Sequence, residues 1–494
     1  MSARRLIEGG AGRVSPIRPM KRLLLSLIAL VPLTPSVVQS KDVLFIAVDD
    51  LNDWTGHLAG HPQARTPNID RLVGRGMAFT NAHCAAPACN PSRAALMSGL
   101  RPWTTGIFTN NDPAQGVMKN TLTINRHFLA QGYNTLGAGK IYHNINSEGR
   151  DDSWTEWKGL FKTDNADVHN LNGLKRGHFD WGPLSNSPQD MGDYKLTDWA
   201  IETLKTAPAE KPLFLAVGYV KPHLPWHVPQ EYYDRFPLEE IQLPEVKEDD
   251  LSDIPPMGVK MAGPEGDHAA VIKADQWKQA VQGYLATISF LDDQVGRLLE
   301  AVENSPRGRE MIIVWWTDHG WALGEKQHWR KFALWNDTTR TSFAITAPGV
   351  TTPGSRSSAP VDYLCVYSTL CELAGVPVPE HVRGPSLMPL MKNGAAPWDH
   401  VAVCSHGRGN HAAIDKQWRY IRYQDGGEEL YDYRADPNEW TNRANDPALA
   451  GIKLKLAAHL PKKQDEAQPT SGSGKGEGKG KNKGKNKKQE NAEN

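Results

Sequence analysis

Four strand-like segments, far apart in the chain, each end in polar residues of the kinds that do chemistry. A continuous apolar run of this length is typical of a strand that is buried on both faces of a parallel sheet. In an open α/β sheet, ligand sites lie just beyond the carboxyl ends of the strands, so residues distant in sequence can converge there. Three such runs and the residues after them are 43–48 with Asp49 and Asp50, 212–219 with His223, and 311–316 with Asp318 and His319. A shorter strand-like segment, 134–136, leads to Lys140 and His143. The pattern predicts an α/β fold with one site at the carboxyl edge of its sheet.

The segments between and after these runs predict the rest of the architecture. Apolar residues recur at helical spacing over residues 281–302, which predicts a helix with one apolar stripe packed in the core. Two polar, Trp-containing stretches, about 145–195 and 228–275, show little periodicity and many turn residues. We expect long loops there, where substrate specificity is usually built. From about residue 396 short strand-like runs predict a small antiparallel subdomain that closes with a helix near 448–459.

The chain is long enough for two folded units. Its 494 residues, 39% of them hydrophobic and 16 of them Trp, suffice for one large α/β domain and a smaller one. We place a catalytic domain at residues 41–395 and the antiparallel subdomain at 396–462. The tail at 463–494 is rich in Gly, Lys and Asn and too hydrophilic to fold, so it is a solvated appendage or a tether to a surface or polyanion.

The charge is unevenly distributed although the formal net charge is zero. Residues 1–40 carry six Arg and Lys against one Glu, and residues 470–494 carry seven Lys against three Glu, which leaves −9 for residues 41–469. An acidic body argues against a nucleic-acid partner. Any anionic substrate must therefore be held by local positive charge.

The N-terminal region has the pattern of a secretory signal. A basic start at Met20 leads into a short apolar run at 23–31, and an acceptable small-residue cleavage site ends at Ser40. Translation can begin at Met20, because residues 1–19 add nothing that looks like structure. The run is well short of the roughly 20 residues that span a bilayer, which disfavours a membrane anchor. We expect a signal peptide at 20–40 and a mature protein, without an integral membrane segment, that is periplasmic or secreted.

Five cysteines are too few for a disulfide scaffold, and the odd number leaves one over. If Cys89 is set aside, the other four allow three pairings, among which the sequence does not choose. These four are Cys84, Cys365, Cys371 and Cys404.

Cys89 stands at a predicted helix start. Asn90 is a favoured N-cap residue and Pro91 a favoured first residue, so a helix should begin there with Cys89 just before it. Unpaired N–H groups at a helix start attract an anion, and Arg93, one turn further, adds positive charge. A cysteine in such a corner is either a low-pKa nucleophile or a buried structural residue, and these residues alone leave both alternatives open.

Three carboxylates are expected at the converging strand ends. Asp49, Asp50 and Asp318, with His319 beside the last, would repel one another unless a cation neutralised them, so we expect a divalent metal. Oxygen-rich coordination suits Ca²⁺ or Mg²⁺. The alternative, in which Asp49 and Asp50 only cap a helix, is disfavoured because both acidic segments follow apolar strands.

Four further residues supply positive charge and proton transfer. Lys140 and His143 form one pair within a segment, and His223 and Lys331 form another from two segments. With the Cys89 corner and a metal they provide a nucleophile, a general acid, a general base and groups that stabilise an oxyanion. These groups are typical of an enzyme that hydrolyses an ester of a tetrahedral anion. Sulfate and phosphate are both tetrahedral, so these residues alone do not separate them.

Residues 89–99 (CNPSRAALMSG) resemble the signature of the type I sulfatases, which is C-x-P-S-R, three residues and a Leu-Thr-Gly-like close. This chain departs only at the close, where it has Met-Ser-Gly. The resemblance covers roughly residues 41–445 and is greatest to the iduronate-2-sulfatases. Its other motifs, in the family's order, are FIAVDDLNDW (45–54), GYNTLGAGKIYH (132–143), VKPHLPW (220–226) and TDHGWALGEKQHWRK (317–331). The resemblance implies an alkaline-phosphatase-like fold, a large mixed sheet flanked by helices with a smaller C-terminal antiparallel sheet.

The resemblance also implies the cofactors and the roles of the site residues. A maturation enzyme would oxidise Cys89 to formylglycine, whose hydrate attacks sulfur. His223 would protonate the departing sugar oxygen, and His143 would accept a proton as sulfate leaves. The implied ligands of one Ca²⁺ are Asp49, Asp50, Asp318, His319 and the modified Cys89, and the implied sulfate contacts are Arg93, Lys140, His143, His223 and Lys331.

Substrate contacts are expected from two places. Trp321 directly follows the Asp318-His319-Gly320 turn and should line the pocket, unless it belongs to the core. A Gly-rich loop of the small subdomain could reach over the site and hold a sugar carboxylate, unless its residues are ordinary loop residues. The residues concerned in this loop are His406, Arg408 and Asn410.

The resulting hypothesis is an exported, Ca²⁺-dependent sulfatase that acts on sulfated oligo- or polysaccharides, with uronate 2-sulfates favoured. One alternative is a phosphoester or phosphonate monoester hydrolase on the same scaffold. Another is a non-catalytic protein that binds sulfated polysaccharides and in which Cys89 is never matured. The full set of His and Lys residues argues against the last, because binding does not need a proton-transfer pair.

Overall fold

The structure is a computed structural model that describes residues 12–13, 41–143, 153–165, 168–462 and 466. From Lys41 onward the described residues form one compact unit. The predicted signal peptide at 20–40 lies outside the described residues, as does the predicted tail except for Glu466. The boundaries of the predicted domains stay predictions.

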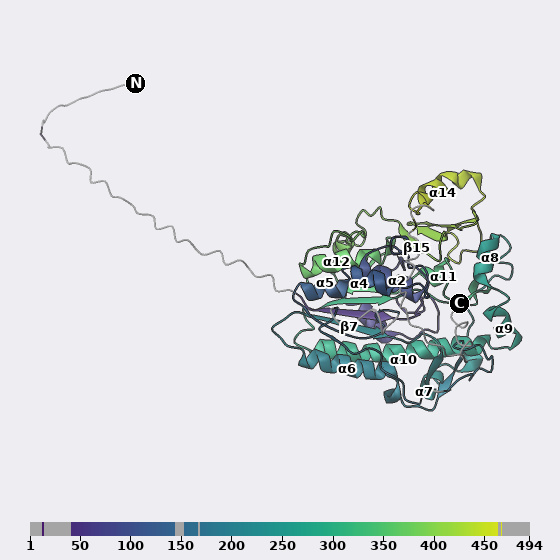
Figure 1. Ribbon diagram of the computed structural model, residues 1–494, viewed down its shortest axis with the longest axis horizontal. Coiled ribbons are helices and arrows are strands. Elements are labelled where there is room, and N and C mark those ends of the chain that lie inside the picture. The colour runs from purple at the N-terminus through teal and green to yellow at the C-terminus, as the bar shows by residue number, and fades with distance from the viewer. Residues whose placement is uncertain (1–11, 14–40, 144–152, 166–167, 463–465, 467–494) are drawn as a thin grey trace, which may run out of the picture. The chain divides into compact units, whose positions relative to one another are not determined.

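An eight-stranded mixed sheet lies at the centre of this unit (Figure 1). Five neighbouring strands run parallel, and they include the four that the strand-like segments predict, in the order β9, β1, β7, β4. β12 runs antiparallel beside β9, which makes the sheet mixed as expected. Across the sheet the strands are β13 (Ser355–Ser357), β2 (Met77–Phe79), β12 (Phe343–Thr346), β9 (Ile312–Thr317), β1 (Val43–Val48), β7 (Leu213–Tyr219), β4 (Asn134–Gly139) and β5 (Glu156–Trp157).

Helices cover both faces of the sheet, as strands buried on two sides require (Figure 1). Alternate residues of β1 point into two cores: Phe45 packs with one and Ile46 with the other. α2 (Cys89–Ser98), α5 (Ile124–Ala130) and α12 (Leu364–Ala374) lie on the first side, and α6 (Gly192–Thr206) and α10 (Trp277–Asn304) on the second. α10 carries the apolar stripe predicted at 281–302, and the prediction that this stripe is core packing is confirmed.

The predicted long loops contain short elements that the sequence analysis missed. Within 145–195, β5 joins the central sheet, and β6 (Trp181–Leu184) pairs with β8 (Trp226–Pro229). Within 228–275 lie three short helices, so the prediction of an unbroken loop is wrong there. Elements of two to seven residues are too short to show a hydrophobic period. The helices are α7 (Gln230–Tyr233), α8 (Pro256–Ala262) and α9 (Asp267–Lys273).

The C-terminal residues form the small antiparallel sheet that the short runs predict. Its strands follow one another in chain order, and α14 (Ala450–Ala457) packs beside them (Figure 1). The strands are β15 (Ala402–Ser405), β16 (His411–Ile414), β17 (Trp418–Arg422) and β18 (Glu428–Asp432). Glu466, beyond the predicted end at 462, contacts His411 Nε2 at 3.1 Å.

All five cysteines are buried and none forms a disulfide bond. One of the pairs that the sequence allows, Cys84 with Cys404, has its sulfur atoms 3.7 Å apart. Cys365 and Cys371 lie on the same helix, α12. Within the described residues, no helix has the length and apolar content needed to cross a bilayer.

Candidate active site

The carboxylates that follow β1 and β9 lie side by side. The parallel register pairs Val48 with Thr317, so Asp49 and Asp50 leave the sheet next to Asp318. The backbone N–H of Asp50 donates to Asp318 Oδ1 at 3.0 Å, and that of Asp318 donates to the Val48 carbonyl at 3.0 Å. All three acids are at most 1% exposed. Asp50 has a φ of 59°, an uncommon backbone conformation for a non-glycine residue, which tertiary contacts must hold.

Arg93 bridges two of these acids. Its Nε donates to Asp318 Oδ2 at 2.9 Å and its Nη2 to Asp49 Oδ1 at 3.0 Å, while Nη1 donates to the Lys140 carbonyl. Its neighbour Ser92 donates from Oγ to the Asp318 carbonyl at 2.5 Å. These contacts show that Arg93 orients the acidic cluster. Its predicted contact with sulfate stays a prediction.

Cys89 is the first residue of α2 and is completely buried. The N-cap residue is Ala88, and the prediction that Asn90 caps the helix is wrong. The Asn90 amide donates instead to the carbonyls of Thr109 at 3.1 Å and Asp112 at 2.9 Å. Because buried carbonyls need hydrogen-bond partners, this loop draws the Asn90 side chain away from the helix end.

Two lysines from separate segments reach Cys89. Lys331 Nζ lies 2.9 Å from Cys89 Sγ and 2.8 Å from Asp50 Oδ1. Lys140 Nζ lies 3.8 Å from Cys89 Sγ and forms a short ion pair with Asp49. Burial alone would lower the pKa of each lysine, but the paired carboxylates raise both pKa values above the ordinary range. The Cys89 sulfur therefore faces two ammonium groups.

The Cys89 thiol is nevertheless hard to ionise. Burial raises the pKa of Cys89 well above its usual value, and Asp49 raises it further. Lys140 and Lys331 act in the opposite direction without cancelling these effects. A thiol that stays protonated is a poor nucleophile, so the structure does not support a low-pKa cysteine at the start of this helix.

Two histidines border the cluster. His223 Nδ1 lies 2.5 Å from the Leu224 carbonyl and so carries a hydrogen, which leaves Nε2 facing Asp50 Oδ2 at 3.7 Å. Burial and the charge of Lys140 hold the pKa of His223 well below its usual value. His143 Nδ1 is buried without a hydrogen bond to any described residue. Burial and the lysine charges lower the pKa of His143 to about 3, so both rings are neutral near pH 7.

The residues predicted to bind a metal lie close together. One ligand atom from each lies within 4.8 Å of the others, and the residues are Asp49, Asp50, Cys89, Asp318 and His319. Asp50 Oδ2 is buried and has no hydrogen-bond partner among the described residues. A buried carboxylate oxygen without a partner is costly, and a cation would satisfy it. The three carboxylates of this set fit a hard divalent cation.

Positive groups of the chain itself neutralise the three carboxylates. Sequence reasoning expected the three carboxylates to repel one another unless a metal neutralised them. The structure surrounds them with three positive groups, and each acid contacts at least one: Asp49 with Arg93 and Lys140, Asp50 with Lys331, and Asp318 with Arg93. The support for a metal is therefore the unpartnered oxygen and the geometry of the donors, not repulsion.

The predicted substrate residues lie close to this cluster or beside a neighbouring cavity. Trp321 is 2% exposed, and Lys331 Nζ lies 5.5 Å from the centre of its ring. His406 lines a cavity next to Ala88 and Phe332. The guanidinium of Arg408 stacks over the Phe108 ring at 4.7 Å. Their contact with substrate stays a prediction, as does that of Asn410, whose amide donates to the carbonyls of His406 and Arg408.

Sequence reasoning missed two residues that hold the cluster. The Tyr284 hydroxyl donates to the Asp50 carbonyl at 2.7 Å and accepts from the Asn52 N–H at 3.0 Å. The Asn52 amide in turn donates to the Trp321 carbonyl at 3.0 Å. Tyr284 lies among the apolar residues of α10, and a hydroxyl in a buried stripe is a signal that it needs a partner.

The fold and the cluster together define an enzyme that hydrolyses esters of a tetrahedral anion. The chain belongs to the sulfatase family. The family described as "Sulfatase" matches residues 41–376, and that described as "N-sulphoglucosamine sulphohydrolase, C-terminal" matches residues 324–466. The resemblance inferred from the motifs is thereby confirmed, and the protein is a sulfuric ester hydrolase.

Named relatives agree with this assignment, and a solved structure agrees with the fold. A sulfatase of Formosa agariphila is 38% identical over 446 residues, which cover 86% of this chain and 87% of the relative. The iduronate 2-sulfatase of Homo sapiens is 30% identical over 451 residues, which cover 80% of this chain and 76% of the relative. The phosphonate monoester hydrolase of Agrobacterium radiobacter superimposes with a TM-score of 0.72 at 20% identity, covering 85% and 94% of the two chains. The predicted alkaline-phosphatase-like fold is confirmed.

Proposed function

We propose that this protein removes sulfate from sulfated carbohydrates, with a formylglycine formed from Cys89 and a bound Ca²⁺. The main support is the setting of Cys89, which stands at a helix start inside a cluster of metal-binding type and between two lysines. As a thiol it is a poor nucleophile there, because burial raises its pKa. Oxidation to an aldehyde would remove this obstacle.

The chain's own residues have separable tasks in this reaction. When present, hydrated formylglycine supplies the attacking oxygen and Ca²⁺ supplies positive charge beside it. Lys140 and Lys331 already point their ammonium groups at position 89, so they are placed to bind the oxygens of a sulfate ester. Asp49, Asp50, Asp318 and His319 would hold the metal, and Arg93 would keep Asp49 and Asp318 in position.

His223 is the proposed proton donor to the departing sugar oxygen. Its Nδ1 is committed to the Leu224 carbonyl, so a proton for the leaving group must come from Nε2, the nitrogen that faces the cluster. The free ring is neutral because burial and Lys140 lower its pKa. An anionic substrate beside the ring would raise that pKa and favour the protonated form. His143, whose Nδ1 has no partner among the described residues and whose pKa is lowered to about 3, is the proposed base for sulfate release.

The proposed substrate is a sulfated uronate in an oligo- or polysaccharide. The name of the human relative, iduronate 2-sulfatase, and the motifs shared with that branch support it. Export to the periplasm or medium after cleavage near Ser40, and maturation by a formylglycine-generating enzyme, complete the proposal. The N-terminal signal lies outside the described residues.

Mass spectrometry of the tryptic peptide from Gly76 to Arg93 is the direct test of the proposed cofactor. We expect the aldehyde or its hydrate at position 89 in protein from the native host, and release of sulfate from 2-O-sulfated uronate oligosaccharides. Cys89→Ala should abolish turnover without lowering the melting temperature by more than a few degrees. Cys371→Ala changes another buried cysteine, in α12, and should keep turnover. Normal turnover by Cys89→Ala would refute the mechanism.

A second candidate function is hydrolysis of phosphate or phosphonate monoesters. It is favoured by the likeness of the fold to a phosphonate monoester hydrolase and by a cluster that any tetrahedral oxyanion would fit. Comparison of sulfate, phosphate and phosphonate esters of one alcohol on one preparation decides between the two. We expect kcat/KM to be highest for the sulfate ester.

A further inference from the structure

A large cavity opens directly beside the nucleophile position. Its volume is about 1230 Å³, and its lining includes Ala88, which precedes Cys89, and Phe332, which follows Lys331. The Phe332 N–H donates to the Pro87 carbonyl at 3.0 Å, so the two segments that carry Cys89 and Lys331 also form this wall. Small-molecule sites usually measure roughly 300–1,000 Å³. The cavity therefore has room for more than the sugar that carries the scissile sulfate.

The lining is strongly basic, in contrast to the acidic body of the chain. The lining contains one carboxylate, that of Asp267, and four lysine and arginine residues, which are Lys175, Arg176, Lys260 and Arg330. The side chains of Lys175 and Lys260 are exposed and form no hydrogen bond or ion pair with any described residue. Local positive charge of this kind is what an anionic substrate needs on a protein whose net charge does not attract it.

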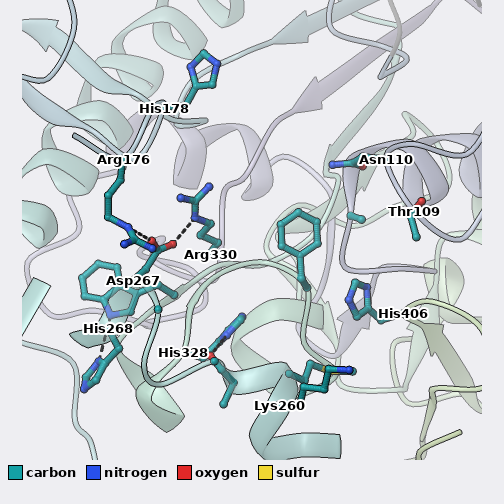
Figure 2. Close-up of a pocket in the computed structure, with 18 of the residues that line it drawn as sticks. Thr109, Asn110, Arg176, His178, Lys260, Asp267, His268, His328, Arg330 and His406 are labelled. Atoms are coloured by element: carbon teal, nitrogen blue, oxygen red, sulfur yellow. Dashed lines mark hydrogen bonds and ion pairs between the residues drawn. The ribbon is translucent and has the colours of Figure 1, made fainter. Parts of the chain in front are cut away.

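Asp267 orients two guanidinium groups and leaves them available. Arg176 Nε donates to Asp267 Oδ1 at 2.7 Å, and Arg330 Nε donates to Oδ2 at 2.6 Å (Figure 2). Each arginine thus uses only its Nε, and the terminal nitrogens have no hydrogen-bond partner in the described part of the chain. A guanidinium held in this way can bind an oxyanion with its two terminal N–H₂ groups.

The remaining walls offer donors and an apolar face suited to a sugar ring. The Trp329 indole N–H donates to His268 Nδ1 at 3.2 Å, which places the His268 hydrogen on Nε2 when the ring is neutral. Phe332 supplies an aromatic surface. Arg330 and Phe332 have φ values of 75° and 77°, conformations that side-chain-bearing residues rarely adopt. The chain thus accepts strain on both sides of Lys331 while that lysine reaches Cys89 and its neighbours line the cavity.

We propose that this cavity binds the sugar next to the one that is desulfated, through a carboxylate or sulfate group of that sugar. The ligand class is an anionic oligosaccharide of at least two units. The inference rests on the proposed function and deepens it, because it makes the neighbouring acidic sugar a determinant of specificity. An isolated monosaccharide sulfate would leave the basic groups of the cavity without their ligand.

The test compares K175Q/K260Q and R176Q with the wild type on two substrates. The first is a tetrasaccharide whose terminal uronate is 2-O-sulfated, and the second is the corresponding monosaccharide 2-O-sulfate. We expect the ratio of kcat/KM for the tetrasaccharide to that for the monosaccharide to fall about tenfold in K175Q/K260Q, mainly through KM. In the wild type, added salt should lower the same ratio. K205Q, which removes an exposed lysine on α6, should leave the ratio unchanged.

The source of the anionic group is resolved by a second tetrasaccharide whose neighbouring sugar lacks sulfate but is otherwise identical. Loss of the mutational effect on this substrate assigns the contact to sulfate, and persistence assigns it to a carboxylate.

An unchanged ratio in both K175Q/K260Q and R176Q, with an active wild type, overturns the inference. If the wild type hydrolyses neither substrate, the proposed function fails, and calorimetric binding of the same tetrasaccharide decides the inference separately. Equal affinity for wild type and K175Q/K260Q would then refute it.

Discussion

At the scale of single residues, Asp50 is held by contacts of its side chain, its backbone N–H and its carbonyl. Its Oδ1 accepts from Lys331, its N–H donates to Asp318, and its carbonyl accepts from Tyr284. Its Oδ2 has no hydrogen bond to any residue that the structure describes, although His223 Nε2 lies 3.7 Å away. A carboxylate fixed by this many contacts presents its remaining oxygen as a preorganised ligand.

The proposed Ca²⁺ should therefore stabilise the folded protein through Asp50. We expect Ca²⁺ to raise the melting temperature of the chelator-treated wild type, because an ion that binds only the folded state stabilises it. Asp50→Asn should lose most of this shift. Asp53→Asn changes a carboxylate that pairs with Arg340 outside the cluster, so its shift should equal that of the wild type. Differential scanning fluorimetry with and without Ca²⁺ measures all three, and a full shift in Asp50→Asn would contradict the assignment.

At the scale of elements, the site depends on how closely β4 and β7 approach at their carboxyl ends. The Lys140 N–H donates to the Gly218 carbonyl at 2.7 Å. A Cβ on Gly218 would lie 2.4 Å from the carbonyl carbon of Lys140, far inside contact distance, and one on Gly139 would lie 2.0 Å from the Gly218 oxygen. The two glycines thus let the backbone of Lys140 lie against β7 while its side chain reaches Asp49.

Gly218→Ala should push Lys140 away from its position. We expect a loss of about 1–3 kcal/mol in the free energy of unfolding, as for other overpacked sites, together with a lower kcat. Gly451→Ala in α14 is a matched control, because a Cβ there meets nothing within 4 Å and alanine favours a helix. Urea unfolding and steady-state kinetics of both variants provide the measurement. Unchanged stability and kcat in Gly218→Ala would show that the strands can separate without cost.

A second element junction lies away from the site and depends on pH. Asp362 in β14 (Val361–Asp362) accepts from Arg101 at 2.7 Å and from His400 Nε2 at 3.1 Å. Burial alone would lower the pKa of His400, but Asp362 raises it to about 10. A raised pKa stabilises the fold below the unfolded value of about 6.5, and this stabilisation is lost as the pH rises through about 10.

His400→Gln should therefore cost most below pH 6.5 and progressively less up to pH 10. We expect a difference in unfolding free energy on the order of a few kcal/mol at pH 6. His127→Gln should show the opposite trend, because burial lowers the pKa of His127, and a lowered pKa favours folding more as the pH rises. Urea titrations at pH 6, 8 and 10 measure both trends. A constant cost for His400→Gln across this range would contradict the charged pair.

The sequence predicted these elements unevenly, for physical reasons that particular residues show. The strands before Asp49, His223 and Asp318 were predictable because continuous apolar runs of this length that end in polar residues are typical of buried strands. The contacts of Asn90 were not, because its partners lie in a loop that only the folded chain brings near. The cavity beside Ala88 could not be foreseen either, since segments near 176, 267 and 330 meet only in three dimensions.

At the scale of the whole molecule, the small C-terminal sheet completes the catalytic unit. Ser405 donates from its backbone N–H to the Ala85 carbonyl at 2.9 Å, four residues before the nucleophile position. The buried Arg419 on β17 donates hydrogen bonds to the segment that follows Lys331. Its Nη1 donates to the Leu334 carbonyl at 3.1 Å and to Thr339 Oγ1 at 2.9 Å. The family match at residues 324–466 spans the same two parts of the chain.

A chain that ends at residue 395 should therefore fail to fold. Truncation would remove the partners of the Leu334 carbonyl and of the Trp335 indole N–H, which donates to Glu429 at 2.7 Å. It would also uncover the apolar core that residues of the small sheet help to form. We expect insoluble product, whereas deletion of 470–494 should leave solubility and melting temperature unchanged. Calorimetry of the full chain should show a single transition. A soluble 41–395 fragment with cooperative unfolding would show instead that the two parts are independent.

The complete burial of Cys89 sets an order of events during biosynthesis. Its sulfur is in contact with Lys331 and His319, so a maturation enzyme could not bind the surrounding peptide once the fold has formed. Global opening is too rare to help, because native proteins are stable by about 5–15 kcal/mol. The proposed conversion must therefore occur on the nascent or unfolded chain. If the proposal holds, protein that folds before it meets the maturation enzyme would stay inactive, and the host's supply of that enzyme would limit the yield of active molecules.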